Sequence, residues 1–266
     1  MAGIRSIIQS REKHFNQVIC LIRCVAFEQH INEVTGMGSA HTTERIKVDD
    51  FVREIDARLR ALPDLATENV RAVRREFSKR LSNASPQAVI DLALGLLNKP
   101  GIEHRFIAYE LIHHHRAALG SLGEKELKQL GHGINSWGVV DMFACYLSGP
   151  AWRENQAPDS LIHGWARSHD RWWRRAALVS TVPLNNKARG DRGDAKRTLS
   201  VCRMLVSERN DMVVKALSWA LRELAKRDSQ AVREFLAEHK DVLAARVVRE
   251  VNNKLTTGLK YPRKDR

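Results

Sequence analysis

The sequence predicts an all-α protein made of stacked helical pairs, and three observations lead to this fold class. Apolar residues recur at three- and four-residue spacing through long segments, whereas no stretch shows the period-two alternation of a half-buried strand. Helix-sized pieces that resemble one another follow at roughly 33 to 40 residues, the period of helical-repeat proteins. Only 15 Gly and 7 Pro occur among 266 residues, too few for the turns of a β-sandwich or barrel.

The expected helices follow one another between short breaks. An amphipathic helix is predicted from Val48 to Leu62. The segments that resemble one another, each with flanking Arg or Lys, are 70–81 with Ala72, 106–118 with Ala108, 137–147, 173–182 with Ala176 and 213–225 with Ala216. Breaks are expected at 62–64, 82–86, 99–101, 120–123, 148–150 and 185–193. The period favours a HEAT-like or armadillo-like solenoid with a concave basic face, and an irregular α-bundle is the alternative.

Residues 37–260 are expected to form a single repeat domain. Residues 1–36 do not follow its pattern, and we interpret them as an N-terminal extension: an extra helix, a flexible segment or sequence included by a wrong start. Residues 261–266 form a basic tail. The segment 185–199 is nearly free of apolar residues and rich in Gly, Asp, Lys and Arg, so it is expected to be an exposed, mobile loop.

The charge of the chain points to a polyanionic partner. Lys plus Arg number 44 and Asp plus Glu 31, a formal net charge of +13, which is typical of proteins that bind nucleic acid or an acidic membrane face. The balance of 43% hydrophobic and 28% charged residues excludes a disordered basic tail protein. Without a secretory signal or an apolar stretch long enough to span a bilayer, the sequence predicts a cytoplasmic, monomeric protein with reduced cysteines.

Trp219 lies away from the apolar face of its predicted helix. That face consists of Val213, Leu217, Ala220, Leu221 and Leu224. Trp219 is roughly 200° around the helix from Leu217, at about 100° per residue. Its helical neighbours are Lys215, Arg222 and Lys226. A large indole among cations suggests a binding site, and packing against the next repeat is the alternative.

Trp137 and Asp141 form a second candidate. They are spaced i, i+4 and so share one helical face, which points away from the apolar residues of 139–147. The helix dipole alone would favour a carboxylate near the N-terminus, but it does not account for the neighbouring indole.

The run Arg171-Trp172-Trp173-Arg174-Arg175 carries more Arg and Trp than an amphipathic helix needs. Arginine is suited to bidentate phosphate contacts and indole faces to bases or sugars. We expect Trp173 to point inward with Ala177, and Arg171 and Arg175 to point outward. Arg174 is expected either to bind phosphate or to form a structural salt bridge. Lys187 and Arg189 in the charged loop are further candidates for phosphate contacts.

Other kinds of site find little support. Consecutive helical residues such as His113, His114 and His115 point about 100° apart and have no acidic partner at ligand spacing, so no metal site is predicted. No glycine-rich phosphate loop and no nucleophilic serine motif occurs. No cofactor is expected.

One carboxylate between indole faces in a basic groove suits the cleavage of an N-glycosidic bond. The sugar becomes oxocarbenium-like, and both a fixed carboxylate and electron-rich rings stabilise that cation. An N-alkylated purine leaves without a general acid, because it is already cationic. The same residues do not favour phosphodiester hydrolysis, because that reaction needs a metal or a paired acid and neither is predicted here.

Three segments resemble the AlkD-type DNA alkylation repair glycosylases. They are 136–141 (SWGVVD), 173–177 (WRRAA) and 215–228 (KALSWALRELAKRD), and the resemblance extends over roughly 48–259. It implies a HEAT-like solenoid that grips duplex DNA and excises N3- and N7-alkylated purines without flipping the base into a pocket.

The resemblance also assigns roles by position. Asp141 matches the catalytic carboxylate, Trp137 and Trp219 match indoles that pack on the deoxyribose, and Arg175 matches an arginine that anchors a phosphate. The predicted activity is therefore that of a monofunctional alkylpurine DNA glycosylase acting on double-stranded DNA. The alternative is a non-catalytic repeat protein that binds damaged or branched DNA, and an RNA-binding or scaffolding solenoid is a third possibility.

Overall fold

A computed structural model describes residues 47–186 and 193–262, and every regular element in these ranges is helical. The prediction of an all-α chain is confirmed. Contacts divide the chain into two compact units, of which the first ends at His115 and the second begins at Arg116. The prediction of a single domain over 37–260 is not tested by this division, and the units are described separately.

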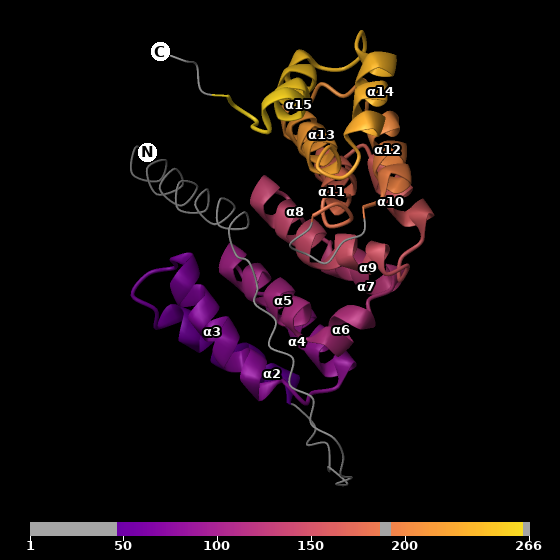
Figure 1. The fold of residues 1–266 in the computed structure, drawn as a ribbon. Helices are drawn as coiled ribbons and strands as arrows, with labels where there is room; N and C mark the ends of the chain where they lie inside the picture. The colour runs from indigo at the N-terminus through magenta and orange to yellow at the C-terminus, as the bar shows by residue number, and fades with distance from the viewer. Residues whose placement is uncertain (1–46, 187–192, 263–266) are drawn as a thin grey trace, which may run out of the picture. The chain divides into compact units, whose positions relative to one another are not determined.

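The first unit contains two stacked helical pairs (Figure 1). Its helices are α2 (Val48–Arg60), α3 (Thr67–Arg80), α4 (Pro86–Leu97) and α5 (Ile102–His114). Helix α2 packs on α4 and α3 on α5, while α4 and α5 also pack on each other. Corresponding helices of successive pairs therefore lie side by side, as expected for helical repeats.

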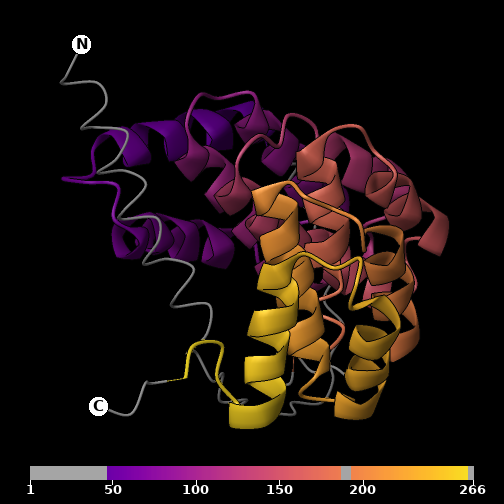
Figure 2. The same cartoon turned by 90° about the horizontal axis from the view of Figure 1, so that it is seen from above.

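The second unit repeats this arrangement with more helices. They are α6 (Arg116–Gly120), α7 (Glu124–Leu130), α8 (Trp137–Phe143), α9 (Gly149–Arg153), α10 (Asp159–Ala166), α11 (Arg171–Ser180), α12 (Ala195–Met204), α13 (Asp211–Leu224), α14 (Ser229–His239) and α15 (Ala245–Thr257). One row consists of α8, α11, α13 and α15, each packed against the next. Helices α10, α12 and α14 pack behind α11 and α13 (Figure 2). The row places residues from distant segments next to one another.

Polar side chains fix where the helices of the row begin. Asp170 accepts a hydrogen bond from the backbone N–H of Trp172 at the start of α11, at 2.8 Å. Asn210 does the same for Met212 at the start of α13, at 3.1 Å. Such caps satisfy N–H groups that have no partner within the helix. The first residues of α11 and α13 are therefore held in defined positions.

The predicted break at 148–150 is wrong. Helix α8 continues through a π-helical turn, Ala144–Ser148, directly into α9. Pro150 stands at the start of α9, where its missing N–H is tolerated. A Cβ on Gly149 would lie 2.6 Å from Pro183 Cγ and 2.8 Å from the carbonyl oxygens of Ala144 and Ser180. Glycine is present because another segment packs directly against the backbone, and not because the helix ends.

The small residues of the predicted repeats do not all occupy the same environment. Ala108, Ala176 and Ala216 are fully buried, whereas Ala72 is exposed, because the buried face of α3 is formed by Val70, Val73 and Phe77 instead.

None of the helices in the described ranges combines the length and apolar character needed to cross a bilayer.

Candidate functional site

Asp141 and Arg175 form a buried ion pair between α8 and α11. Arg175 Nε donates to Asp141 Oδ1 and Arg175 Nη2 to Asp141 Oδ2, both at 2.8 Å. The Asp141 side chain is 1% exposed and that of Arg175 6%. Two parallel hydrogen bonds from a guanidinium to a carboxylate are stronger than hydrogen bonds between neutral groups and fix the relative orientation of the two side chains. The pair joins residues 34 positions apart in the sequence.

The predicted orientation of these two side chains away from the core is wrong. Helix α8 was expected to be apolar on one face only, but every residue from Gly138 to Phe143 is buried. Helix α11 covers the face that carries Asp141. Arg175 was expected to point to solvent and instead turns into this interface. A buried carboxylate requires a partner charge, and Arg175 supplies it.

The environment of Asp141 has opposing effects on its acidity. Burial raises the pKa of the Asp141 carboxyl above its ordinary value, because the charged form loses its hydration. The charge and the hydrogen bonds of Arg175 act in the opposite direction. Burial and Arg175 thus act in opposite directions on the charge state of this carboxylate.

Arg175 also joins this pair to the start of α13. Its Nη1 donates to the carbonyl oxygen of Met212. Three of the five guanidinium N–H groups are then used, and the other two have no partner among the residues that the structure describes. Arg175 can therefore hold Asp141 and still offer hydrogen bonds to an anion.

The two predicted indoles belong to the same row of helices. Trp137 and Trp219 are each partly exposed, on α8 and α13. Trp137 lies one turn before Asp141 on the same helix, and Trp219 lies seven residues beyond Met212, about 10 Å further along α13. The predicted off-core position of Trp219 agrees with its partial exposure.

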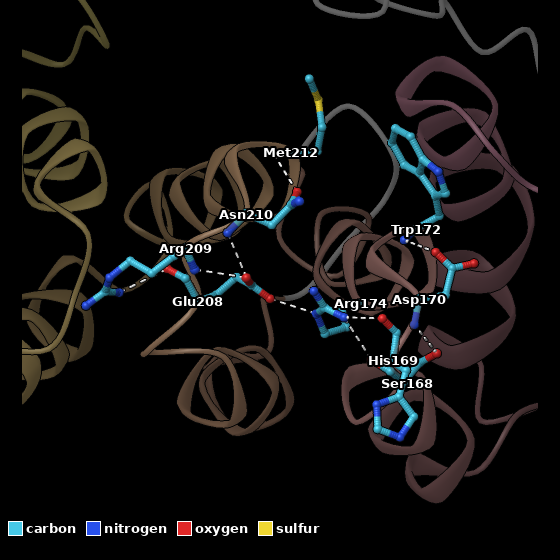
Figure 3. A network of polar contacts seen from close by, with 9 residues as sticks. All are labelled: Ser168, His169, Asp170, Trp172, Arg174, Glu208, Arg209, Asn210 and Met212. Carbon is cyan, nitrogen blue, oxygen red and sulfur yellow. Dashed lines mark hydrogen bonds and ion pairs between the residues drawn. The ribbon is translucent and has the colours of Figure 1, made fainter.

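Arg174 holds two loops together (Figure 3). Its Nε donates to Glu208 Oε2 at 2.7 Å, and its Nη1 donates to the carbonyl oxygens of Ser168 and His169 at 3.0 and 2.8 Å. The other Glu208 oxygen accepts the backbone N–H groups of Arg209 and Asn210 at 2.9 and 2.8 Å. Of the two roles expected for Arg174, this geometry favours the structural salt bridge.

Arg222 is not on a cationic surface beside Trp219, as its position at i+3 suggested. It is 7% exposed, its Nε donates to Ser218 Oγ at 3.1 Å, and it lies 4.0 Å from Glu250 Oε2. Packing of α15 against α13 covers this face. The helical-face argument failed here because it treated α13 as having only one packed side.

The remaining predicted cations differ in exposure. Arg171 is exposed, with its guanidinium carbon 4.8 Å from the ring centre of Trp172. Lys215 is partly exposed and paired with Asp211 at 2.7 Å. Trp173, expected inside, is partly exposed and packs against Trp165, with ring centres 4.9 Å apart and ring planes tilted by 39°. Lys187 and Arg189 lie outside the described residues.

Sequence reasoning missed Glu208, Asp211, Met212 and Arg246. Met212 takes part through its backbone carbonyl, so no side-chain pattern could have revealed it. Asp211 precedes Lys215 at i, i+4, which was a usable signal. Arg246 Nη1 contacts Asp211 Oδ1 at 2.8 Å, a pairing that only the packing of α13 on α15 reveals. No cluster of three or more potential metal ligands occurs within 47–186 and 193–262.

Two comparisons with known proteins bear on this site. None of the curated proteins matches the chain. A family model described as DNA alkylation repair enzyme matches residues 62–255, a range that includes all of α8, α11 and α13. This match covers well over half of the chain and indicates a role in the repair of alkylated DNA, with DNA as the substrate. The chain therefore belongs to the DNA alkylation repair enzyme family.

Proposed function

We propose that this protein is a monofunctional DNA glycosylase that removes N3- and N7-alkylated purines from duplex DNA. The observation that carries the proposal is the buried carboxylate of Asp141, held by one arginine on a helix that also presents a partly exposed indole one turn away. Family membership and the net charge of +13 support DNA as the ligand. No metal, cofactor or general acid enters the mechanism.

The proposed reaction breaks the bond between C1′ of the deoxyribose and the purine nitrogen. The bonding electron pair leaves with the base, which neutralises the positive charge of the alkylated ring. C1′ becomes an oxocarbenium-like centre, and water forms the new C1′–O bond and loses a proton to solvent. The negative charge of Asp141 stabilises the cationic sugar and orients the water. Trp137 and Trp219 present their electron-rich faces to the deoxyribose.

Arg175 has two tasks in this mechanism. Its hydrogen bonds to both oxygens keep Asp141 ionised in a site where burial favours the neutral acid. Its two remaining N–H groups are suited to a backbone phosphate of the bound duplex. Arg175 thereby links the position of the DNA backbone to the charge state of the catalytic carboxylate.

The test is the release of free base from methylated duplex DNA by the wild-type protein and by Asp141→Asn. We expect wild type to release methylated purine and Asp141→Asn to be slower by about 100-fold or more, the usual effect of removing one electrostatic stabiliser. DNA affinity should be retained. Asp241→Asn removes an exposed carboxylate in the same unit and should excise normally.

Loss of excision through misfolding is excluded by measuring the circular dichroism and DNA affinity of Asp141→Asn itself, and a second variant tests the cost of leaving Arg175 unpaired. Asp141→Asn combined with Arg175→Met removes both charges of the pair, which avoids leaving one of them buried alone. It should fold and still fail to excise. Undiminished excision by a folded Asp141→Asn would refute the mechanism.

The second candidate is a non-catalytic protein that binds damaged or branched DNA. It is favoured by one observation, namely that both Asp141 oxygens already accept hydrogen bonds from Arg175 and that the carboxylate is 1% exposed. Its signature would be tight, salt-sensitive binding with no base released by wild type or variant.

A further inference from the structure

Asp211 binds two cations that come from different helices. Its Oδ2 lies 2.7 Å from Lys215 Nζ, one turn along α13, and its Oδ1 lies 2.8 Å from Arg246 Nη1 at the start of α15. One carboxylate therefore fixes a lysine and an arginine at the junction of two neighbouring helices of the row.

Fold stability does not account for this trio. The side chains of Asp211, Lys215 and Arg246 are 55%, 41% and 37% exposed, and ion pairs in that setting contribute little to stability. The helix dipole and i, i+4 spacing explain an acid at Asp211 with Lys215 beside it. They do not explain a second cation from α15.

The trio lies beside the Asp141–Arg175 pair. Asp211 immediately precedes Met212, whose carbonyl oxygen accepts a hydrogen bond from Arg175. The pKa of Asp211 lies below its ordinary value because of the hydrogen bond from Lys215 first, followed by the charges of Lys215, Arg246 and Arg175, with partial burial acting against them. Asp211 is therefore ionised wherever DNA binding is measured.

Both cations keep donors for a ligand. An ammonium has three N–H groups and a guanidinium five, and each contact with Asp211 uses one of them. Lys215 and Arg246 have no other partner within the described parts of the chain. The trio has a net charge of +1 and presents several N–H groups to solvent, an arrangement suited to one phosphate diester.

We propose that Lys215 and Arg246 bind a single backbone phosphate of duplex DNA and that Asp211 is the positioning residue that holds them together for it. The identity of the ligand rests on the proposed function of the neighbouring site. Because two flexible side chains are held in place before binding, less conformational entropy is lost when the phosphate arrives. Arg246 thereby becomes a DNA-contacting residue on α15.

The test depends on whether removing the negative charge of Asp211 raises or lowers the affinity for DNA. Removing a negative charge from a DNA-binding surface normally strengthens binding, since repulsion of phosphates is relieved. A positioning role predicts the opposite: Asp211→Asn should bind unmodified duplex DNA about 3- to 10-fold more weakly, the effect of losing one hydrogen bond. Asp241→Asn, with the same charge change at an exposed position without this geometry, should bind equally well or slightly more tightly.

Three further variants separate a positioning role from a general loss of DNA affinity. Arg246→Gln should lower affinity and reduce the slope of log affinity against log salt by about one. In that background Asp211→Asn should cause no further loss, because there is no cation pair left to hold, and Asp211→Glu should restore part of the affinity to otherwise wild-type protein. Melting temperatures should stay unchanged.

Unchanged or tighter binding by Asp211→Asn, or losses that simply add to those of Arg246→Gln, would overturn the inference. Because this experiment measures binding to undamaged DNA, its result is independent of excision. A protein that binds as described but releases no base would refute the glycosylase and leave the phosphate site standing.

Discussion

Glu110 in the first unit and Asp141 in the second are both buried carboxylates that join helices of successive pairs, but they are neutralised differently. Glu110 on α5 accepts Arg71 Nε on one oxygen and Arg74 Nε on the other, each at 3.0 Å, from α3. Within the described residues, Asp141 has only Arg175 for both oxygens. The first arrangement carries a surplus of positive charge, and the second is balanced.

The surroundings of the two carboxylates differ as well. All six tryptophans of the chain lie beyond residue 115, and two of them are the partly exposed Trp137 and Trp219 on the helices around Asp141. Near Glu110, the Arg71 guanidinium carbon lies 5.5 Å from the ring centre of Phe106. The same way of joining helices thus supports a structural contact in one unit and a candidate active site in the other.

The largest difference in stability is expected when one arginine is removed from each buried carboxylate. Arg175→Ala leaves Asp141 buried without a partner, which should cost about 3–5 kcal/mol. Arg74→Ala leaves Glu110 still paired with Arg71 and should cost about 1.5–3 kcal/mol, as for one hydrogen bond to a charged group. Urea unfolding of both variants at neutral pH measures the two losses. Equal losses of unfolding free energy would show that Arg71, as the remaining partner of Glu110, does not reduce the cost of removing an arginine.

The acidity of Asp141 should appear in the pH dependence of excision. The active form is the carboxylate, so activity falls as pH is lowered through the pKa of Asp141. Because burial raises that pKa, the fall should begin at a higher pH than for an ordinary aspartate, whose pKa is about 3.9. Single-turnover rates, corrected for spontaneous depurination, give the pH at which excision falls to half of its maximum. Arg175→Lys should raise this pH further. If the pH stays the same, Arg175 does not control the charge state of Asp141.

The smallest effect on stability is expected at the salt bridge between Arg174 and Glu208. Glu208→Gln weakens contacts that hold the start of α13, and it should cost about 1.5–3 kcal/mol because hydrogen bonds to a charged group are weakened. Glu54→Gln breaks a bidentate pair with Arg80 whose side chains are 44% and 39% exposed, and should cost less than about 1 kcal/mol. Thermal unfolding compares them. The Glu208 side chain is only 12% exposed, so a larger loss for Glu54→Gln would contradict the expectation that a buried ion pair contributes more to stability than an exposed one.

Much of the fold could be predicted from the sequence, because helical periodicity depends on residues close together in the chain. The helix predicted from Val48 to Leu62 is observed as Val48–Arg60. The error at 148–150 arose because Gly and Pro are normally read as helix breakers, whereas Gly149 is required by the close approach of Pro183. A contact between distant segments decided that position.

The candidate site was predicted less well than the fold. The spacing of Trp137 and Asp141 singled out both residues, but their helix was assigned only one packed face. Since α11 covers the other, Asp141 is buried, and its partner Arg175 was expected in solvent. Arg222 was misplaced for the same reason, because α15 covers it. In a stack of helices each inner helix has neighbours on both sides, and a single helical wheel contains no information about the second neighbour.

The π-helical turn at Ala144–Ser148 has a consequence for insertions and deletions. A π turn holds one residue more than an α-helical turn of the same rise. Both kinds of turn complete one revolution, so deleting one residue there would restore regular α-helix and leave Trp137 and Asp141 facing almost as they do now relative to α9. Asp141 would then still face Arg175. A homologue that is one residue shorter in this segment can therefore keep the same pairing on α11, because the π turn sets the length of the helix and not the direction of its carboxylate.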